Sequence, residues 1–140
     1  METRDIMSTP VLAVTPSASL AEAAREMLCR GFTSLPVVDA GGRLVGVVDE
    51  ADLVRAGFPD PARELGNADR RATPAAGSDT VEAVMHTPGV AVPADLDPAE
   101  LARRMTDAGV RALPVVEHEL LVGVVTFQDV LRVLPAAGQP

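Results

Sequence analysis

The sequence predicts an α+β protein, an α/β-type sandwich, made of two copies of one β-α-β-β-α unit. The main observation is an internal repeat: at an offset of 78, residues 7–38 align with residues 85–116, and fifteen of the 32 positions are identical. After the loss of one residue the offset becomes 77, and residues 44–48 match residues 121–125 without a mismatch. A unit of about 50 residues cannot easily bury the apolar face of its own small sheet, so the two copies are expected to pack on each other.

Helix-capping residues mark the first helix of each copy. A short extended piece is expected at 11–14 and again at 90–92, and a helix follows it. Ser19, with Glu22 three residues later, predicts the helix start in the first copy; in the second copy Asp97 is the N-cap, Pro98 takes the first helical position and Glu100 is a capping-box acid. The helices are expected to end at two C′ glycines, Gly31 and Gly109.

The second half of each unit contains two apolar strands and a last helix. The strands are Leu-Pro-Val-Val and Leu-Val-Gly-Val-Val, joined by turns at 39–43 and 117–119, and the last helix is expected to begin at Asp49 or Thr126. The predicted organisation is therefore repeat 1 at 1–56, a linker at 57–79, repeat 2 at 80–135 and a tail at 136–140. A helical turn is expected near 62–65, and a short helix at 80–85 leads into the second copy.

Composition excludes several function classes. The net charge is −8, all 12 basic residues are Arg, and there is no Trp or Tyr, so neither a polyanion nor stacked bases are expected partners and no nucleic-acid partner is predicted. Cys29 is the single cysteine, which rules out an intrachain disulfide and a cysteine-based zinc site. No apolar stretch of about 18 residues occurs, so no membrane partner is expected and a cytoplasmic protein is predicted.

Two copies of three ordered motifs carry a family resemblance. These are Met-x-Thr-Pro, Gly-x-x-x-Leu-Pro-Val-Val-(Asp/Glu) and Gly-Val-Val-x-x-x-Asp, and together they resemble the CBS-domain pair, or Bateman module. The resemblance implies a pseudo-two-fold axis, two clefts between the repeats and a homodimer. It also implies a regulatory adenosyl ligand, namely AMP, ADP, ATP or S-adenosylmethionine, with Mg²⁺ as an optional companion and no obligatory cofactor.

The same resemblance assigns the ligand to the motif Gly-x-x-(Thr/Ser)-x-x-Asp, which is matched by Gly123, Thr126 and Asp129. In the family, the hydroxyl meets phosphate and the Asp accepts the ribose hydroxyls. The residues themselves agree with these roles, because Thr126 and the first-turn amides would form an anion site while Asp129, on the same helix face, would accept a cis-diol. Gly123 would let the backbone approach the ligand, and Arg111 would reach the phosphates.

A structural alternative accounts for the same residues. Thr126 is an ordinary N-cap and Asp129 is the acid that closes a capping box, so helix capping alone explains both. Arg111 is equally well explained as a solvated surface arginine.

The first copy departs from the family motif. Asp49 stands where the second copy has Thr126, and Glu50 follows it. The added carboxylates would repel phosphate, so this site is expected to be empty, to prefer an uncharged adenosyl group, or to need a bridging cation. Asp52 would still hold a ribose.

No catalytic or metal site is predicted. His86 and His118 lie in different repeats without a third ligand at metal spacing, and both are interpreted as surface histidines. The sequence therefore favours a stand-alone, non-enzymatic regulatory module that binds an adenine nucleotide and acts on an effector protein of unknown kind. The alternatives are a dimerisation or interaction scaffold with vestigial ligand sites and, more remotely, a hydrolase or transferase, for which no general base is found.

Overall fold

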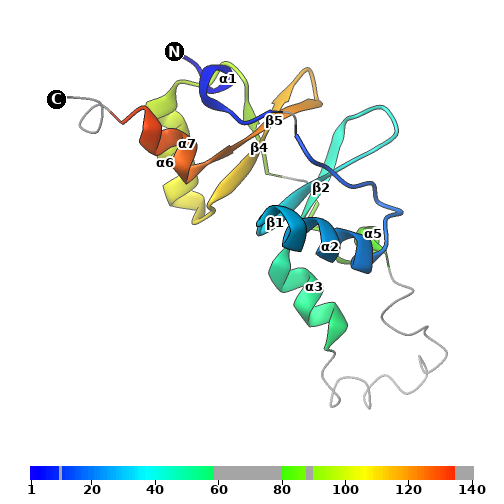
Figure 1. Cartoon of the computed structure of the whole chain (residues 1–140). Coiled ribbons are helices and arrows are strands. Elements are labelled where there is room, and N and C mark those ends of the chain that lie inside the picture. The colour runs from blue at the N-terminus through cyan, green and yellow to red at the C-terminus, as the bar shows by residue number, and fades with distance from the viewer. Residues whose placement is uncertain (10, 59–79, 88–89, 135–140) are drawn as a thin grey trace. The chain divides into compact units, whose positions relative to one another are not determined.

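A computed structural model describes residues 1–9, 11–58, 80–87 and 90–134 of the chain (Figure 1). The mixture of helices and small sheets confirms the α+β class. The expected helical turn near 62–65 and the tail at 136–140 lie outside the described residues. Within the described residues, no helix has the length and apolar content that crossing a bilayer requires.

The helices and strands are α1 (Thr3–Ile6), α2 (Leu20–Arg30), β1 (Ser34–Val38), β2 (Leu44–Asp49), α3 (Glu50–Gly57), α5 (Val81–Val84), β3 (Val92–Pro93), α6 (Pro98–Ala108), β4 (Ala112–Glu117), β5 (Leu120–Thr126) and α7 (Phe127–Arg132).

The chain folds into two compact units whose boundaries differ from those of the sequence repeats. The α7 unit contains residues 1–12 and 40–44 together with the described part of 89–140. The α3 unit contains residues 13–39 together with the described part of 45–88. Each unit therefore combines most of one repeat with the Met-x-Thr residues from the start of the other repeat, 7–9 or 85–87.

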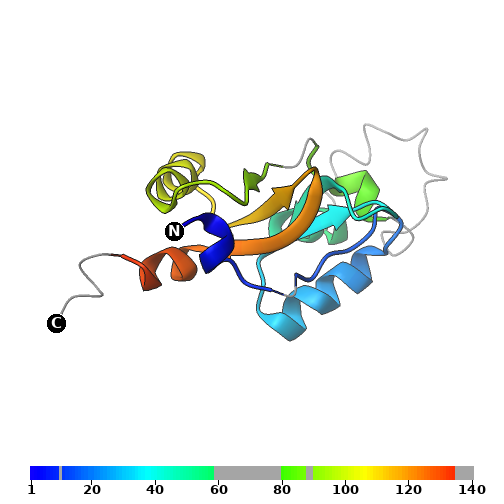
Figure 2. The same ribbon diagram turned by 90° about the horizontal axis from the view of Figure 1, so that it is seen from above.

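The α7 unit is built on a three-stranded sheet in the order β3-β4-β5. β3 runs parallel to β4, and β4 pairs with β5 in antiparallel register, with Ala112 opposite Thr126. The segment at the N-terminus joins this unit, since α1 lies against β5 (Figure 2) and Ser8 forms an antiparallel bridge with Val124. The fully buried centre of the core consists of Leu101, Met105, Val115 and Val125.

The α3 unit repeats this plan with a smaller sheet. β1 and β2 form a two-stranded sheet, Val14 adds a parallel bridge to Val37, and His86 adds an antiparallel bridge to Val47. The short helix expected at 80–85 is confirmed as α5, which begins after Thr80. The fully buried side chains of this unit include Ala23, Leu35, Val37, Val48 and Val81.

The helix ends follow the local sequence signals. Ser19 Oγ accepts the Glu22 N–H at 3.0 Å, and Asp97 Oδ2 accepts the Ala99 N–H at 2.9 Å. Gly31 and Gly109 close α2 and α6 in the left-handed conformation, with φ of +73° and +68°. These N-cap and C′ assignments are confirmed.

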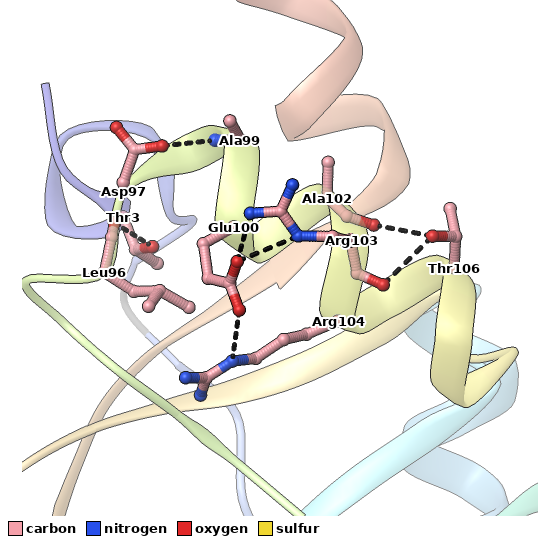
Figure 3. A network of polar contacts seen from close by, with 9 residues as sticks. All are labelled: Thr3, Leu96, Asp97, Ala99, Glu100, Ala102, Arg103, Arg104 and Thr106. Atoms are coloured by element: carbon pink, nitrogen blue, oxygen red, sulfur yellow. Dashed lines mark hydrogen bonds and ion pairs between the residues drawn. The ribbon is translucent and has the colours of Figure 1, made fainter.

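Glu100 does not act as the capping-box acid that the sequence suggests. Its carboxylate instead pairs with Arg103 and Arg104 on the next turn of α6 (Figure 3). The hydrogen bond from Arg103 is the main reason that the pKa of Glu100 is lowered. A long arginine fork at i+3 competes successfully with the single backbone N–H that a capping box would offer.

Two strand glycines allow the Met-x-Thr-Pro segments to pack closely. A Cβ at Gly123 would lie 2.5 Å from Met7 Sδ and 3.2 Å from the Ser8 carbonyl oxygen. A Cβ at Gly46 would lie 2.9 Å from both Met85 Sδ and the His86 carbonyl oxygen. The glycine that was expected to admit a ligand therefore admits the protein's own chain.

We predict that Gly46→Ala lowers the free energy of unfolding by about 1–3 kcal/mol, because the new methyl group meets a backbone oxygen that cannot rotate away. Gly57→Ala is the matched control, since a Cβ at this end of α3 meets nothing within 4 Å. It should be neutral, or stabilising by up to about 1 kcal/mol. Urea denaturation measures both, and equal midpoints for the two variants would contradict the packing argument.

Candidate functional site

Thr126 and Asp129 lie together at the end of β5 and form a complete capping box. Thr126 Oγ1 accepts the Asp129 N–H at 3.2 Å, and Asp129 Oδ2 accepts the Thr126 N–H at 2.9 Å. The Asp129 residue is only 3% exposed. The capping interpretation is confirmed, and a contact with a ligand stays a prediction.

Asp129 has two further partners that the sequence analysis did not assign. Arg132 Nη1 donates to Asp129 Oδ1 at 2.6 Å, and Ser8 Oγ lies 3.3 Å from both carboxylate oxygens. The arginine has a sequence signal, because Arg55 and Arg132 occupy the same place in the two repeats. Ser8 has none, because its contact with Asp129 joins positions 121 residues apart.

The structure also places the backbone of Arg111 at the start of α7. Its carbonyl oxygen accepts the Phe127 N–H at 3.0 Å, and its side chain is exposed. Since the amides of Phe127 and Asp129 both have partners within the chain, the anion site expected from first-turn amides is already partly occupied. The Thr126 hydroxyl also has a partner, because Oγ1 donates to Asp129 Oδ2 at 3.1 Å. A phosphate at this end of β5 would have to take the hydroxyl from Asp129 or depend on the Arg111 guanidinium.

The α3 unit contains the equivalent arrangement with different side chains. Asp49 caps α3 and Asp52 closes its capping box, with both hydrogen bonds at 2.9 Å. Arg55 Nη2 donates to Asp52 Oδ1 at 2.7 Å, as Arg132 does to Asp129. The Thr33 carbonyl oxygen accepts the Glu50 N–H at 2.9 Å, so Thr33 takes the place of Arg111.

His86 takes the place of Ser8, and its contact with the aspartate is shorter, 2.9 Å against 3.3 Å. Its Nε2 lies 2.9 Å from Asp52 Oδ1 and 3.9 Å from Asp49 Oδ2. The His86 side chain is 60% exposed, as a surface histidine would be, yet the sequence analysis missed its carboxylate partners. They are 34 and 37 positions away in the chain, which no local metal-ligand spacing covers.

His118 agrees better with its assignment as a surface histidine. It is exposed in the turn between β4 and β5 and has a positive φ of 53°.

The two positions differ in the side chains around the buried aspartate, which pairs with an arginine in both units. The α7 unit presents the hydroxyls of Ser8 and Thr126, which suit a phosphorylated diol. The α3 unit presents two aspartates, the neighbouring Glu50 and an imidazole, which suits a cation. Residues that correspond in the repeat therefore support different ligand chemistry.

Comparison with known families identifies the repeated unit. The CBS domain family matches residues 4–58 and 81–136, which together are most of the chain. The chain belongs to the CBS domain family. It contains two CBS domains, as the repeated motifs indicated.

Curated relatives of different length align with most of this chain. The protein MJ1404 of Methanocaldococcus jannaschii is 31% identical over 91% of this chain, which spans 30% of that protein. A 17.7 kDa protein of Acidianus ambivalens is 31% identical over 92% of this chain, which spans 70% of it.

Solved CBS structures similar to this chain contain several kinds of ligand. CBSX2 in complex with AMP is 26% identical, with a TM-score of 0.81, over 99% of this chain and 98% of that one. The CBS domain pair of MJ0100, in complex with 5′-methylthioadenosine and S-adenosylmethionine, is 25% identical with a TM-score of 0.73 over 98% of each chain. Hypoxic Response Protein I, with two coordinated zinc ions, is 27% identical with a TM-score of 0.75 over 96% of this chain and all of that one.

We predict that Thr126→Val destabilises the protein by about 1 kcal/mol, because valine keeps the shape of threonine but cannot accept the Asp129 N–H. Thr126→Ser, which retains the hydroxyl, should remain within a few tenths of a kcal/mol of wild type. Urea denaturation without ligand separates the two variants. If the valine variant were as stable as the serine variant, the capping bond would contribute nothing to stability.

Proposed function

We propose that the chain is a regulatory module that binds an adenosyl ligand at Thr126 and Asp129 of the α7 unit. The observation that supports it most directly is the Thr-x-x-Asp pair at the end of β5 in a family whose solved members include complexes with AMP and with S-adenosylmethionine. We assign no catalytic role to any residue.

In this proposal, the ribose hydroxyls replace Ser8 at Asp129. The two Ser8 contacts, at 3.3 Å, are the longest polar contacts of the carboxylate; the Arg132 and Thr126 amide contacts are 2.6 and 2.9 Å. Exchange of a long, weak hydrogen bond for two shorter ones to a diol favours binding, while Arg132 keeps the carboxylate in place.

The phosphate position follows from the charges. We assign the positive group to Arg111, whose carbonyl oxygen accepts the Phe127 N–H next to Thr126, and the residues of the α3 unit that correspond to Arg111 and Thr126 are Thr33 and Asp49. A phosphorylated ligand such as AMP, ADP or ATP therefore favours the α7 unit. Asp52 of the α3 unit is the weaker candidate for a ribose contact, because the imidazole of His86 already contacts its Oδ1.

Ligand binding would act on a partner through the exposed Ser8 segment. Ser8 and Val124 are joined by two backbone hydrogen bonds of 2.7 and 3.2 Å, so the Ser8 backbone can stay on β5 while a ligand at Asp129 makes the exposed Ser8 hydroxyl change its rotamer. We propose that this shift alters a homodimer contact or a contact with an effector protein. In the relatives that are longer than this chain, the effector would be another part of the same protein.

A panel of AMP, ADP, ATP, S-adenosylmethionine and 5′-methylthioadenosine, each with and without Mg²⁺, tests the proposal by thermal shift. A ligand at about 100 times its dissociation constant adds about 2.7 kcal/mol and should raise the unfolding midpoint by several degrees. Asp129→Asn should abolish the rise. The matched change in the other unit, Asp52→Asn, should preserve it.

The panel also distinguishes a ligand-binding module from the alternative of a dimerisation or interaction scaffold. If no compound raises the midpoint at millimolar concentration, the Thr126–Asp129 pair only caps a helix, and the chain is better described as a dimerisation or interaction scaffold. If the rise survives Asp129→Asn and disappears with Asp52→Asn, ligand binding stands but its site is in the α3 unit.

We predict that Arg111→Gln weakens AMP binding by about tenfold and leaves 5′-methylthioadenosine binding unchanged, because only AMP carries a phosphate for the guanidinium. Arg25→Gln removes the same charge from an exposed position on α2 and controls for the loss of net charge. Isothermal titration calorimetry measures the affinities of the wild type and of both variants for each of the two ligands. Equal losses for the two ligands would show that Arg111 does not contact phosphate.

A further inference from the structure

The strongest cluster outside the proposed adenosyl site contains three metal-ligating side chains of the α3 unit. Asp49, Asp52 and His86 each offer one ligand atom, and these atoms all lie within 4.8 Å of one another. No other such group of three occurs among the residues that the structure describes. The ligands come from two segments, the start of α3 and the residue after Met85, so the cluster is a product of the tertiary fold.

The backbone fixes all three residues relative to one another. His86 exchanges two hydrogen bonds with Val47, its N–H donating to the Val47 carbonyl oxygen at 2.8 Å and its carbonyl oxygen accepting the Val47 N–H at 3.1 Å. Val47 lies two residues before Asp49 in the same chain segment. The mutual bonds of the capping box hold Asp49 and Asp52 on one face of the first turn of α3.

The side chains combine one fixed ligand with two adjustable ones. Asp52 is buried, and its Oδ1 accepts from Arg55 at 2.7 Å, which is the kind of outer hydrogen bond that orients a metal-ligating carboxylate. The side chains of Asp49 and His86 are 43% and 60% exposed, so they can adjust without repacking a core. Asp49 Oδ1 accepts the Asp52 N–H, which leaves Oδ2 on the side of His86.

The distances suit a small divalent ion. Ligand atoms around a tetrahedral zinc ion lie roughly 3.3 Å apart, given metal–ligand bonds of about 2.0–2.2 Å. The His86 Nε2 distances to Asp52 and Asp49, 2.9 and 3.9 Å, lie on either side of that value. Three protein ligands with a solvent-exposed side would leave a coordination position for water.

The local charge also favours a cation. The start of a helix carries about half a positive charge, which opposes metal binding. Asp49, Asp52 and the neighbouring Glu50 contribute three negative charges, which outweigh this positive end of the helix. The residue that corresponds to Arg111 in the α3 unit is Thr33, which carries no charge. Arg55 opposes a cation because it pairs with Asp52 at 2.7 Å, and its side chain is 66% exposed to solvent.

The other unit provides an internal comparison. At the two positions where the α3 unit has His86 and Asp49, the α7 unit has Ser8 and Thr126, while the aspartate and the arginine are retained. Both differences replace a hydroxyl by a group that binds transition metals well. A histidine that served only as a hydrogen-bond donor to Asp52 would not require the second change.

We propose that Asp49, Asp52 and His86 bind a divalent transition-metal ion such as Zn²⁺. The imidazole selects such an ion over Mg²⁺, for which an all-oxygen site is preferred. The site shares no residue with Thr126, Asp129 and Arg111 and does not depend on the proposed adenosyl ligand. It gives Asp52 a metal in place of the ribose expected from the sequence.

The test uses the untagged full chain, stripped with a chelator and titrated without nucleotide. Zn²⁺ is followed by calorimetry and thermal shift, and Co²⁺ by its visible absorption. We expect the wild type to bind one equivalent of Zn²⁺ or Co²⁺ and to unfold at a higher temperature with either ion. Any shift of the midpoint by Mg²⁺ should be the same in the wild type and in His86→Ser. His86→Ser and Asp49→Thr should each weaken Zn²⁺ binding by at least about tenfold.

The controls separate ligation from folding. Both substitutions introduce the residue that the α7 unit has at the same place, and the midpoint without metal reports any loss of stability. His118→Ser removes the other histidine and should leave Zn²⁺ binding unchanged. The double substitution Ser8→His with Thr126→Asp should create a second Zn²⁺ site, in the α7 unit, so that the variant binds two equivalents of Zn²⁺.

Three results would overturn the proposal: no Zn²⁺ binding by the wild type at millimolar concentration, unchanged binding by His86→Ser, or equal stabilisation by Mg²⁺ and Zn²⁺. None of them bears on the adenosyl site, whose test uses Asp129→Asn and no transition metal.

Discussion

In each unit, the position of the polar site depends on a close contact between a strand glycine and the first two residues of a Met-x-Thr-Pro motif, Met7–Ser8 or Met85–His86. Because Gly46 and Gly123 have no side chain, the residues after Met85 and Met7 lie within hydrogen-bond distance of β2 and β5. That contact brings one side chain, His86 or Ser8, to a buried aspartate at the start of the next helix. The shape of the polar site is thus a consequence of close backbone packing several residues away.

The backbone arrangement is common to both units, so their chemistry differs only through the side chains that they present. Each buried aspartate has the same arginine three residues later and the same capping role. These bonds account for the burial of a carboxylate, because its oxygens are satisfied without any ligand. The variable positions around it, Ser8 against His86 and Thr126 against Asp49, are therefore the positions at which the two proposed sites differ.

Local features of the fold could be predicted from the sequence, and contacts between distant segments could not. The caps at Ser19, Asp97 and Thr126 and the C′ glycines were recognisable because each depends on residues within one helical turn. The helix α1 and the partners of His86 were missed, because each depends on tertiary packing: Thr3 is fully buried and donates its hydroxyl to Leu96, 93 positions away. Glu100 was misassigned because arginines on the same helix competed for it.

The same reasoning explains why the family motif Gly-x-x-(Thr/Ser)-x-x-Asp is by itself a weak guide to ligand chemistry in this chain. Thr126 and Asp129 satisfy each other, so their presence alone is accounted for by helix stability. A ligand must then offer Asp129 more than Ser8 does, which is a modest requirement because the Ser8 contacts are long. At Asp52 a ligand must compete with the His86 imidazole at 2.9 Å, which is a stricter requirement. In both proposals, therefore, the residue contributed by the distant segment, Ser8 or His86, distinguishes the two aspartates more than the motif itself does.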